Sequence, residues 1–392
     1  MHDRHAAEVR RLRVLQITRN LPPLRGGMER LNLRMAHELA LEFDLALIGP
    51  YGCGTESPSN AQIAEIPAKP LWRFFLSAAS KAISTANKFK PDAVLAGSGL
   101  AAPFAWLAAK MASARMIVYV HGLDLIASHP IYRMAWCPAI RRADLCIANS
   151  RNTARLAAGM GVPQSRIIIV HPGVDIPERP TRANNFRARF ELGDRPVLLS
   201  VGRLVLRKGL QEFVENALSH IVARLPNACL VVLGDEAPNT LHGRCGGLRD
   251  RIQERAACLG LADNVRFIGP QDDTTLADAY EAADVHVFPV REVAGDVEGF
   301  GMVAAEAAAH GLCSVAFAVG GVPDAIGDGI SGRLIMAGDY MQFAASVVEA
   351  IENRGDAGLR EKARSFAERF RWEHFGDQIR QHLRQSVRAQ AS

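Results

Sequence analysis

The chain has 392 residues, of which 48% are hydrophobic and 22% are charged, with 33 Gly and 20 Pro. This length exceeds what one hydrophobic core usually serves, so we expect two domains and exclude a single small module. The composition is that of a globular protein, which excludes a disordered or collagen-like chain.

Charge is divided unevenly along the chain. Residues 1–190 contain 25 Lys and Arg against 13 Asp and Glu, a net charge of +12, whereas residues 191–392 contain 21 against 28, a net charge of −7. A basic first half is expected to meet an anionic partner, such as a lipid surface, a phosphorylated acceptor or nucleic acid. A chance distribution of surface charge is the alternative.

The seven cysteines are scattered and form no C-x-x-C motif, which argues against a disulfide framework or a structural zinc site. No apolar stretch approaches the roughly 18 residues of a membrane span, and the first apolar run, Val14 to Ile17, is too short for a signal-peptide core. No D-x-D, H-E-x-x-H or His/Cys cluster indicates an obligatory metal. We therefore expect a cytoplasmic protein without a bound metal.

Short apolar runs alternate with Ala-, Leu- and Arg-rich segments of helical spacing along the chain. The predicted strands of the first half are residues 13–17, 45–48, 93–96, 116–120, 145–148 and 167–170. Those of the second half are residues 197–201, 229–233, 265–268, 285–288, 314–318 and 333–336. This alternation predicts an α/β fold with two Rossmann-like, doubly wound parallel-sheet domains.

The predicted domains are residues 1–175 and 197–370, joined by a Pro- and Asn-containing linker at 176–196. Residues 371–392 are expected to form a helix that caps the second domain or crosses back to the first. A helix predicted at Leu71 to Lys90 combines aromatic and apolar side chains with four cations. Such a helix can lie on an anionic membrane surface, and the alternative is an ordinary domain helix with a solvated basic face.

Three loops and one further strand end of the predicted sheets stand out, because ligands of open parallel sheets bind beyond the carboxyl ends of strands. Gly26 and Gly27 follow the first strand and open a helix, where backbone N–H groups and the helix dipole favour a phosphate. His121 ends the strand 116–120, and an imidazole there can bond a substrate hydroxyl or a transition-state oxygen. Arg203 and Lys208 follow the first strand of the second half, where cations can neutralise a leaving diphosphate.

The sharpest motif is the run from Asp296 to Glu306, which opens an Ala-rich helix after the strand 285–288. Its glycines expose backbone amides at a helix N-terminus, which suits a phosphate or sugar oxygens. Glu306 lies inside the helix and can accept two hydrogen bonds from a ribose diol. Glu298 precedes the helix and is expected nearer the reacting sugar.

A competing motif is Gly97-Ser98-Gly99-Leu100-Ala101-Ala102, which follows a strand and matches G-x-G-x-x-A. This pattern is typical of dinucleotide binding, and it makes a dinucleotide-dependent oxidoreductase the alternative function. The acidic ribose ligand that should follow roughly 20 residues later is missing. His121 stands in its place.

Taken together, these motifs resemble the retaining glycosyltransferases of family four, which have the GT-B fold with two Rossmann-like domains and an interdomain cleft. The resemblance covers nearly the whole chain. Further segments that carry it are residues 170–175, 201–209, 267–269, 282–289, 320–324 and 328–332. One departure is His171-Pro172, where many members have Pro-Asn; it touches the hinge rather than the catalytic residues.

The resemblance implies a nucleotide-diphosphate sugar as donor, held by the second domain. Arg203 and Lys208 would stabilise the diphosphate, and Glu306 would bind the ribose. Glu298 would contact the donor sugar.

The resemblance also assigns roles to backbone groups and to the first domain. The backbone of Phe300 and Gly301 would contact the donor sugar, and His121 would reach it from the first domain. Gly26 and Gly27 would let the first-domain loop approach the phosphates. Closure of the domains about the hinge would exclude water.

The resemblance finally implies a reaction class. The enzyme would transfer a hexose-type sugar with retention, without an obligatory cofactor or metal, to a lipid-linked glycan or another cell-surface polysaccharide precursor. It would sit at the inner face of the membrane as a peripheral protein, with no nucleic-acid partner. A transferase for a small soluble acceptor and a catalytically dead sugar-nucleotide sensor are the alternatives. UDP and GDP donors are both compatible with the sequence.

Overall fold

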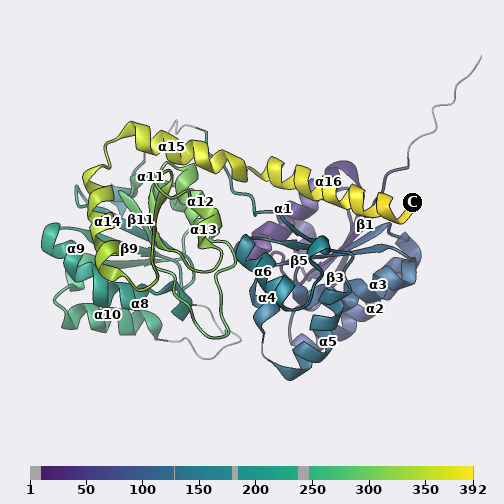
Figure 1. Ribbon diagram of the computed structural model, residues 1–392. Coiled ribbons are helices and arrows are strands. Elements are labelled where there is room, and N and C mark those ends of the chain that lie inside the picture. The colour runs from purple at the N-terminus through teal and green to yellow at the C-terminus, as the bar shows by residue number, and fades with distance from the viewer. Residues whose placement is uncertain (1–9, 128, 179–183, 237–246, 392) are drawn as a thin grey trace, which may run out of the picture. The chain divides into compact units, whose positions relative to one another are not determined.

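The computed structural model describes residues 10–127, 129–178, 184–236 and 247–391. Contacts divide the chain into two compact units, one made of residues 1–171 and 372–392 and the other of residues 172–371. Each unit is built on its own parallel sheet with helices packed against it (Figure 1). The prediction of two doubly wound α/β domains is confirmed.

The first unit contains, in its described part, a seven-stranded sheet in the order β3-β2-β1-β4-β5-β6-β7. The strands are β1 (Arg13–Ile17), β2 (Asp44–Pro50), β3 (Gln62–Ile66), β4 (Ala93–Ala96), β5 (Arg115–Val120), β6 (Leu145–Ala148) and β7 (Ile167–Ile169). The helices are α1 (Gly27–Glu42), α2 (Leu71–Phe89), α3 (Ala102–Ala112), α4 (Leu123–Ile126), α5 (Pro130–Arg141), α6 (Arg151–Gly159) and α16 (Trp372–Ala391).

The second unit has a six-stranded sheet in the order β10-β9-β8-β11-β12-β13. The strands are β8 (Val197–Val201), β9 (Cys229–Leu233), β10 (Val265–Gly269), β11 (Val285–Phe288), β12 (Ser314–Phe317) and β13 (Gly332–Ile335). The helices are α7 (Phe186–Arg189), α8 (Leu210–Phe213), α9 (Ser219–Arg224), α10 (Leu248–Cys258), α11 (Asp273–Ala282), α12 (Met302–Ala309), α13 (Val322–Ala325), α14 (Tyr340–Glu352) and α15 (Ala357–Ala367).

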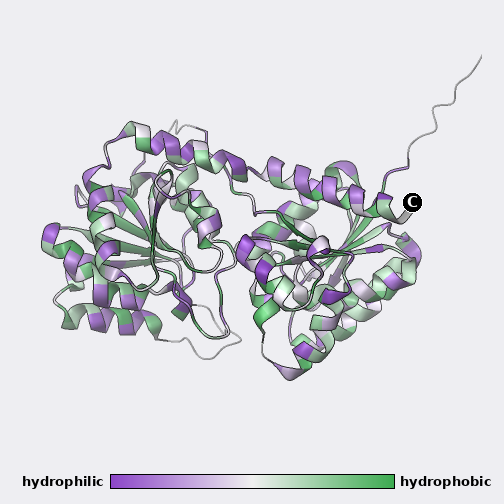
Figure 2. Cartoon of the chain, viewed as in Figure 1, coloured by the Kyte–Doolittle hydropathy of each residue, from purple (hydrophilic) through white to green (hydrophobic). Residues whose placement is uncertain are grey.

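All twelve predicted strands form, and the central strands of both sheets are mainly apolar (Figure 2) and largely buried. The prediction missed β3, which pairs with β2 at the edge of the first sheet. Its sequence, QIAEI, is only half-buried. Gln62 and Glu65 interrupt its apolar residues, so it lacks the continuous apolar run by which the other strands were predicted.

The division into units differs from the predicted boundaries. Val174, predicted in the first domain, donates its N–H to the carbonyl of Phe370 at 2.7 Å and lies in the core of the second unit. Phe186, predicted in the linker, begins α7 and is buried in the same unit. These apolar side chains fill the second core, which is why the unit begins earlier than the composition suggests. Part of the predicted linker, residues 179–183, lies outside the described residues.

The final helix, α16, belongs to the first unit. It packs along α1 and buries Phe375, Ile379 and Leu383 at helical spacing. Arg380 forms an ion pair with Glu38 of α1. This amphipathic pattern completes one side of the first core.

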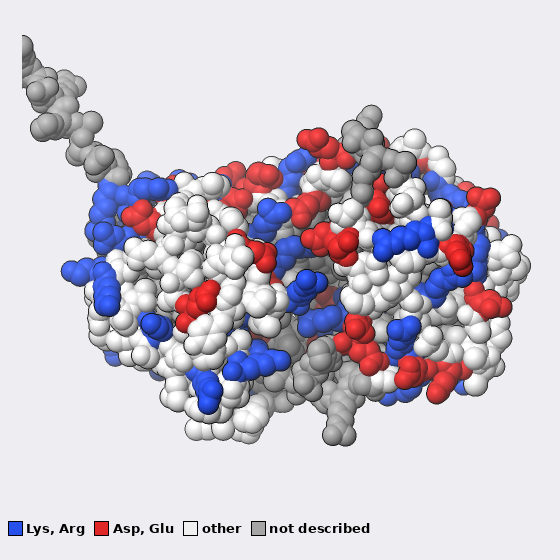
Figure 3. Space-filling view, turned by 180° about the vertical axis from the view of Figure 1, so that it is seen from behind, with Lys and Arg blue, Asp and Glu red and all other residues white. Residues whose placement is uncertain are grey.

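Grouping the charges by unit preserves the asymmetry seen along the chain. The first unit contains 24 Lys and Arg against 13 Asp and Glu, and the second contains 22 against 28. On the face shown in Figure 3, however, side chains of both signs are interspersed over each unit. The excess positive charge of the first unit is therefore not gathered into a single-sign patch on that face.

Candidate active site

The candidate site of the second unit lies at the point where its strand order reverses. β8 pairs with β9 on one side and with β11 on the other. After β8 the chain adds strands toward one edge of the sheet, and after β11 it adds them toward the opposite edge. The loops after β8 and β11 therefore open a crevice at the carboxyl edge of the sheet, where ligands of this fold class bind. Arg203 and Lys208 lie in the first of these loops, and Glu298 lies in the second.

The loop after β8 is fixed by close backbone contacts. Gly209 has φ +67°, and a β-carbon there would overlap the carbonyl oxygen of Pro289. Arg291 donates its N–H to the carbonyl of Arg207 at 2.8 Å. Only glycine allows this approach, so the sequence brings the β8 and β11 loops together at this point.

Two cations and two carboxylates form an ion-pair cluster between these loops. Nζ of Lys208 lies 2.9 Å from Oε2 of Glu298, and Nε of Arg207 lies 3.2 Å from the same oxygen. Nη1 of Arg207 also lies 3.3 Å from Oδ2 of Asp296. All four side chains are less than one-fifth exposed, so solvent screens these pairs less than it screens surface pairs.

Burial and pairing act on this cluster in opposite directions. Burial alone would raise the pKa of Glu298, but Lys208 and Arg207 outweigh it and lower that pKa to about 2. Burial lowers the pKa of Lys208 despite the attraction of Glu298. For Arg207, burial is outweighed by Glu298 and Asp296, and the pKa is raised. At neutral pH the carboxylate of Glu298 is therefore ionised.

Arg203 stands apart from the ion pairs. Its side chain is exposed, and no residue in the described part of the chain forms an ion pair with it. Its charge nevertheless acts on Lys208, whose pKa it helps to lower. Arg203 and Lys208 thus lie near enough for their charges to interact, and the side chain of Arg203 is exposed to solvent.

The segment that carries Glu298 rests on the loop after β12. Gly321 donates its N–H to the carbonyl of Glu298 at 2.9 Å. A β-carbon at Gly321 would overlap the carbonyl oxygen of Gly299. Because Gly320 and Gly321 lack side chains, their backbone packs directly against the backbone of Glu298 and Gly299 and fixes its position.

Glu306 lies in α12 and is buried, with its carboxylate held by a residue that the sequence did not point to. Tyr280 of α11 donates its hydroxyl hydrogen to Oε2 of Glu306 at 3.0 Å. The phenol ring is itself buried and stacks on His310 with 5.3 Å between ring centres. Residue spacing missed Tyr280, and it placed Arg207 in the loop after β8 without giving it a role of its own.

Phe300 and Gly301 form the start of α12. The ring of Phe300 is buried and packs against Phe370 with 5.3 Å between ring centres. Gly301 has φ +96° and precedes the first helical residue, Met302. The side chain of Phe300 therefore serves the core, and backbone groups are what this segment can offer a ligand.

In the first unit, Gly26 and Gly27 lie at the N-terminus of α1, as predicted. Gly26 has φ +154° and Gly27 begins the helix. The carboxylate of Glu29 lies over Gly26, where it also accepts a hydrogen bond from the side-chain amide of Asn20 at 2.8 Å. The carboxylate of Glu29 therefore lies near the N-terminus of α1, which is the positive end of the helix dipole.

His121 lies at the carboxyl end of β5 and is buried. Its Nε2 donates to the carbonyl of Gly97 at 2.9 Å, because a carbonyl oxygen only accepts. Its backbone N–H donates to the carboxylate of Asp124 at 3.1 Å. Within the described residues Nδ1 has no hydrogen-bond partner, so the neutral ring can accept one from a ligand.

The glycines of the Gly97–Ala102 motif have packing roles in the first unit. A β-carbon at Gly97 would overlap the side chain of Asn32, and one at Gly99 would lie 2.6 Å from the β-carbon of Asp124. The need for glycine at both positions is thereby explained without a dinucleotide.

The helix predicted at Leu71 to Lys90 is α2. Its buried face consists of Phe74, Ala78, Ala82, Ala86 and Phe89, so two of the aromatic side chains, Phe74 and Phe89, serve the core. Phe75 packs on Trp136 of α5 with 5.0 Å between ring centres. The exposed apolar side chains are Leu71, Trp72 and Leu76, and α5 adds Ile131 and Met134.

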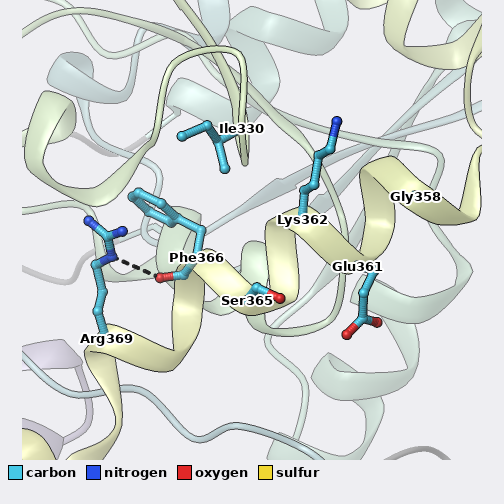
Figure 4. Close-up of a pocket in the computed structure, with 7 residues that line it drawn as sticks. All are labelled: Ile330, Gly358, Glu361, Lys362, Ser365, Phe366 and Arg369. Carbon is cyan, nitrogen blue, oxygen red and sulfur yellow. Dashed lines mark hydrogen bonds between the residues drawn. The ribbon is translucent and has the colours of Figure 1, made fainter.

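Two pockets of the described residues lie away from the predicted site residues. One, of about 490 Å³, lies along α15 and is lined by Ile330, Gly358, Glu361, Lys362, Ser365, Phe366 and Arg369 (Figure 4). The other, of about 450 Å³, lies at the amino end of the first sheet beside Arg11 and Arg13. The ion-pair cluster instead lies at the carboxyl edge of its sheet, where the side chains of the cluster pack against one another.

Among the described residues, no group of three or more His, Cys, Asp or Glu side chains is placed to hold a metal ion. No helix in this part of the chain has the length and apolar character needed to cross a membrane.

Comparison with known proteins identifies relatives of both units. Residues 25–178 match the family described as Glycosyltransferase Family 4, and residues 181–371 match the family described as Glycosyl transferases group 1. A GDP-mannose-dependent alpha-(1-6)-phosphatidylinositol monomannoside mannosyltransferase of Mycolicibacterium smegmatis is 31% identical over 353 residues, which cover 85% of this chain and 88% of that protein.

Other relatives match over shorter stretches or in fold alone. A D-inositol 3-phosphate glycosyltransferase of Mycobacterium ulcerans is 33% identical over 256 residues, and the match spans about half of that protein, 52%. The crystal structure of Anabaena Alr3699/HepE in complex with UDP-glucose superposes with a TM-score of 0.76 at 19% identity, over 95% of this chain and all of that one. Sucrose-phosphate synthase from Thermosynechococcus elongatus gives 0.78 at 21% identity, over 97% of this chain and all of that one.

Proposed function

Because the chain belongs to the glycosyltransferases that combine a Family 4 domain with a group 1 domain, we propose that it is a retaining hexosyltransferase. It takes a hexose from a nucleotide-diphosphate sugar and transfers it to a lipid-linked glycan or another cell-surface polysaccharide precursor. The ion-pair cluster at the switch point of the second sheet is the observation that carries this proposal.

The cluster has the charges that departure of a nucleoside diphosphate requires. Arg203 is an exposed cation, and Lys208 is a buried one held by a single carboxylate. Preorganised cations stabilise negative charge as it develops on a leaving group, and they do so more strongly where water is excluded. Arg203 and Lys208 would bind the diphosphate in this way.

The carboxylates divide between the sugar and the nucleoside. Glu298 is ionised and precedes α12, where it can accept hydrogen bonds from sugar hydroxyls. Glu306 lies within α12 and is oriented by a hydrogen bond from Tyr280. Its carboxylate would accept hydrogen bonds from the ribose hydroxyls. The backbone of Phe300 and Gly301, at the start of the same helix, would complete the sugar contacts.

For the chemical step we infer attack of the acceptor hydroxyl from the face that the diphosphate leaves. The acceptor oxygen forms the new bond to the anomeric carbon as the bond to the diphosphate oxygen breaks, and the proton passes to the leaving phosphate. The configuration is then retained without a covalent intermediate on the protein. His121 of the first unit would accept a hydrogen bond from the donor sugar through Nδ1.

The donor is best sought first among GDP sugars. The relative from Mycolicibacterium smegmatis is GDP-mannose-dependent and matches 85% of this chain. The Anabaena protein binds UDP-glucose, but its similarity shows the fold alone. GDP-mannose is therefore the first donor to test, and UDP-glucose the second.

A lipid-linked acceptor agrees with the surface of the first unit. Trp72 and Leu76 lie on one side of α2, one helical turn apart, and Arg73 lies over the Trp72 ring at 5.2 Å. Ile131 and Met134 of α5 are also exposed, and Phe75 of α2 contacts α5 through Trp136. Exposed apolar side chains beside cations, in a unit with excess positive charge, suit a peripheral position on an anionic leaflet.

The test of the function is ligand-dependent thermal unfolding followed by transfer assays. GDP, UDP, ADP, TDP and NAD are each added to the purified protein, since a ligand that binds only the native state raises the melting temperature. We expect a shift with one nucleoside diphosphate, its loss in Arg203→Ala/Lys208→Ala, and transfer from the matching sugar. A shift with NAD alone would replace this proposal by a dinucleotide-dependent enzyme.

A further inference from the structure

The ion-pair cluster is balanced before any donor binds. Arg207 and Lys208 contribute two positive charges, and Asp296 and Glu298 contribute two negative ones. A nucleoside diphosphate adds at least two negative charges at neutral pH. Arg203 supplies one cation, and a paired cation that exchanged its carboxylate for the diphosphate would supply the second.

The two paired cations are held in different ways. Lys208 has one carboxylate partner, Glu298, and its Nζ also lies 4.4 Å from the centre of the Phe288 ring. Its ammonium is a point charge on a flexible stem, which can turn to a new anion without leaving its place in the loop. Lys208 is therefore the cation that can exchange Glu298 for a phosphate.

Arg207 is fixed at both ends of its guanidinium. Its Nε faces Glu298 and its Nη1 faces Asp296, so the planar group bridges two carboxylates of the β11 loop. Its backbone carbonyl accepts a hydrogen bond from Arg291 of that loop. Moving Arg207 toward a phosphate would break both of its ion pairs, and it would leave the largely buried carboxylate of Asp296 without its cation.

We propose that Arg207 is a positioning residue that keeps Glu298 in place and ionised while Lys208 turns to the diphosphate, with Asp296 fixing the orientation of Arg207. This inference rests on the proposed function. It divides three neighbouring cations by role: Arg203 and Lys208 act on the phosphates, and Arg207 acts only through Glu298.

Electrostatics agrees with this division. The groups that control the ionisation of Glu298 are Lys208 and Arg207, while Asp296 faces Glu298 only through Arg207 and Arg203 lies beyond Lys208. The opposite wall, formed by Gly320 and Gly321, presents backbone only. Once Lys208 binds phosphate, Arg207 is the remaining cation that lowers the pKa of Glu298.

The test compares Arg207→Gln, Arg207→Lys and Asp296→Asn with the wild-type chain. For each, kcat and the KM for the donor are measured from pH 4.5 to pH 9. The matched control is Arg224→Gln, which removes an arginine from an exposed ion pair with Glu352 in the same unit. Melting temperatures are recorded for all variants, so that loss of structure is separated from loss of positioning.

We expect Arg207→Gln to lower kcat at least tenfold and to move the acid limb of the kcat profile to higher pH by about one unit, because Glu298 in the donor complex then protonates more readily. The KM for the donor should change less than threefold, since Arg203 and Lys208 are intact. Arg207→Lys should restore the acid limb but only part of kcat, because an ammonium cannot bridge both carboxylates. Asp296→Asn should lower kcat with a smaller movement of the limb.

The opposite results would overturn the inference. A wild-type acid limb in Arg207→Gln, with or without lower kcat, would mean that Arg207 does not act on Glu298. A tenfold rise in KM with unchanged kcat would make Arg207 a phosphate ligand instead. If Arg207→Gln does not fold, Arg207→Lys and Asp296→Asn decide through the same two measurements. A wild-type chain that binds and turns over no nucleotide sugar would remove the proposed function as well, which distinguishes the two failures.

Discussion

Replacing Glu298 by Gln tests the buried ion pairs through protein stability, without any substrate. The carboxylate lies 2.9 Å from Lys208 and 3.2 Å from Arg207 and is only 11% exposed. Its pKa is lowered from 4.5 to about 2. At about 1.4 kcal/mol for each tenfold change in a proton equilibrium, this shift corresponds to about 3 kcal/mol of stability.

The sign of the pH dependence follows from the direction of the shift. A group whose pKa is lowered by folding stabilises the native state above its unfolded pKa, and this contribution is lost as the pH falls toward the folded pKa. Glu298 therefore contributes fully above about pH 5, loses about half of its contribution by pH 3, and contributes nothing near pH 2. The amide of Glu298→Gln makes no such contribution at any pH.

We therefore expect Glu298→Gln to be about 3 kcal/mol less stable than the wild type at pH 7 and to approach it as the pH falls to 3. Urea unfolding at both pH values measures the difference. All four tryptophans, Trp72, Trp106, Trp136 and Trp372, lie in the first unit, so their fluorescence reports that unit while circular dichroism reports both. The loss should appear in the dichroism transition alone.

The matched control is Glu352→Gln, whose carboxylate is 57% exposed and lies 3.5 Å from Arg224. Exposed pairs contribute about 0–1 kcal/mol, so this variant should differ little from the wild type at either pH. The same destabilisation of Glu298→Gln at pH 3 and pH 7 would refute the reasoning, because the loss would then come from packing rather than from charge.

Two further predictions concern the backbone and the surface. Gly209→Ala should lower the free energy of unfolding by at least about 2 kcal/mol, because its β-carbon would overlap the carbonyl of Pro289. Gly260→Ala, at a similar φ of +71° in open space, should lower it by only about 1 kcal/mol. Equal losses in the two variants would contradict the role given to the close contact at Gly209. The double variant Trp72→Ser/Leu76→Ser should lower sedimentation with anionic liposomes at least fivefold. The control is Leu259→Ser, which replaces an exposed leucine of the second unit. Unchanged liposome binding in the double variant would place the membrane contact elsewhere.

The strands and the positions of the main site residues could be predicted because both depend on local sequence. A buried parallel strand needs an uninterrupted apolar run, as at Val197–Val201 and Cys229–Leu233, and each of these two runs formed with the predicted bounds. The residues just after such runs necessarily lie at one edge of the sheet. Strand positions alone therefore suffice to place Arg203, Lys208 and Glu298 at the same edge.

The partners within the site could not be predicted in the same way. Arg207 and Glu298 are 91 residues apart, and their ion pair depends on how Gly209 brings two loops together. Tyr280 reaches Glu306 from a different helix, and its helical position resembles that of any core residue. Such contacts follow from tertiary packing, which a strand-by-strand interpretation does not contain.

The return of α16 to the first unit has a consequence for biosynthesis. Residues 172–371 form one continuous segment and can complete their own fold as soon as they are made. The first unit cannot, because Phe375, Ile379 and Leu383 of its core come from the last helix. At about 5–20 residues per second, synthesis of the intervening 200 residues takes roughly 10–40 s. During that interval the face of α1 that packs on α16 is uncovered on the nascent chain, so the half of the protein that is made first is the half that is finished last.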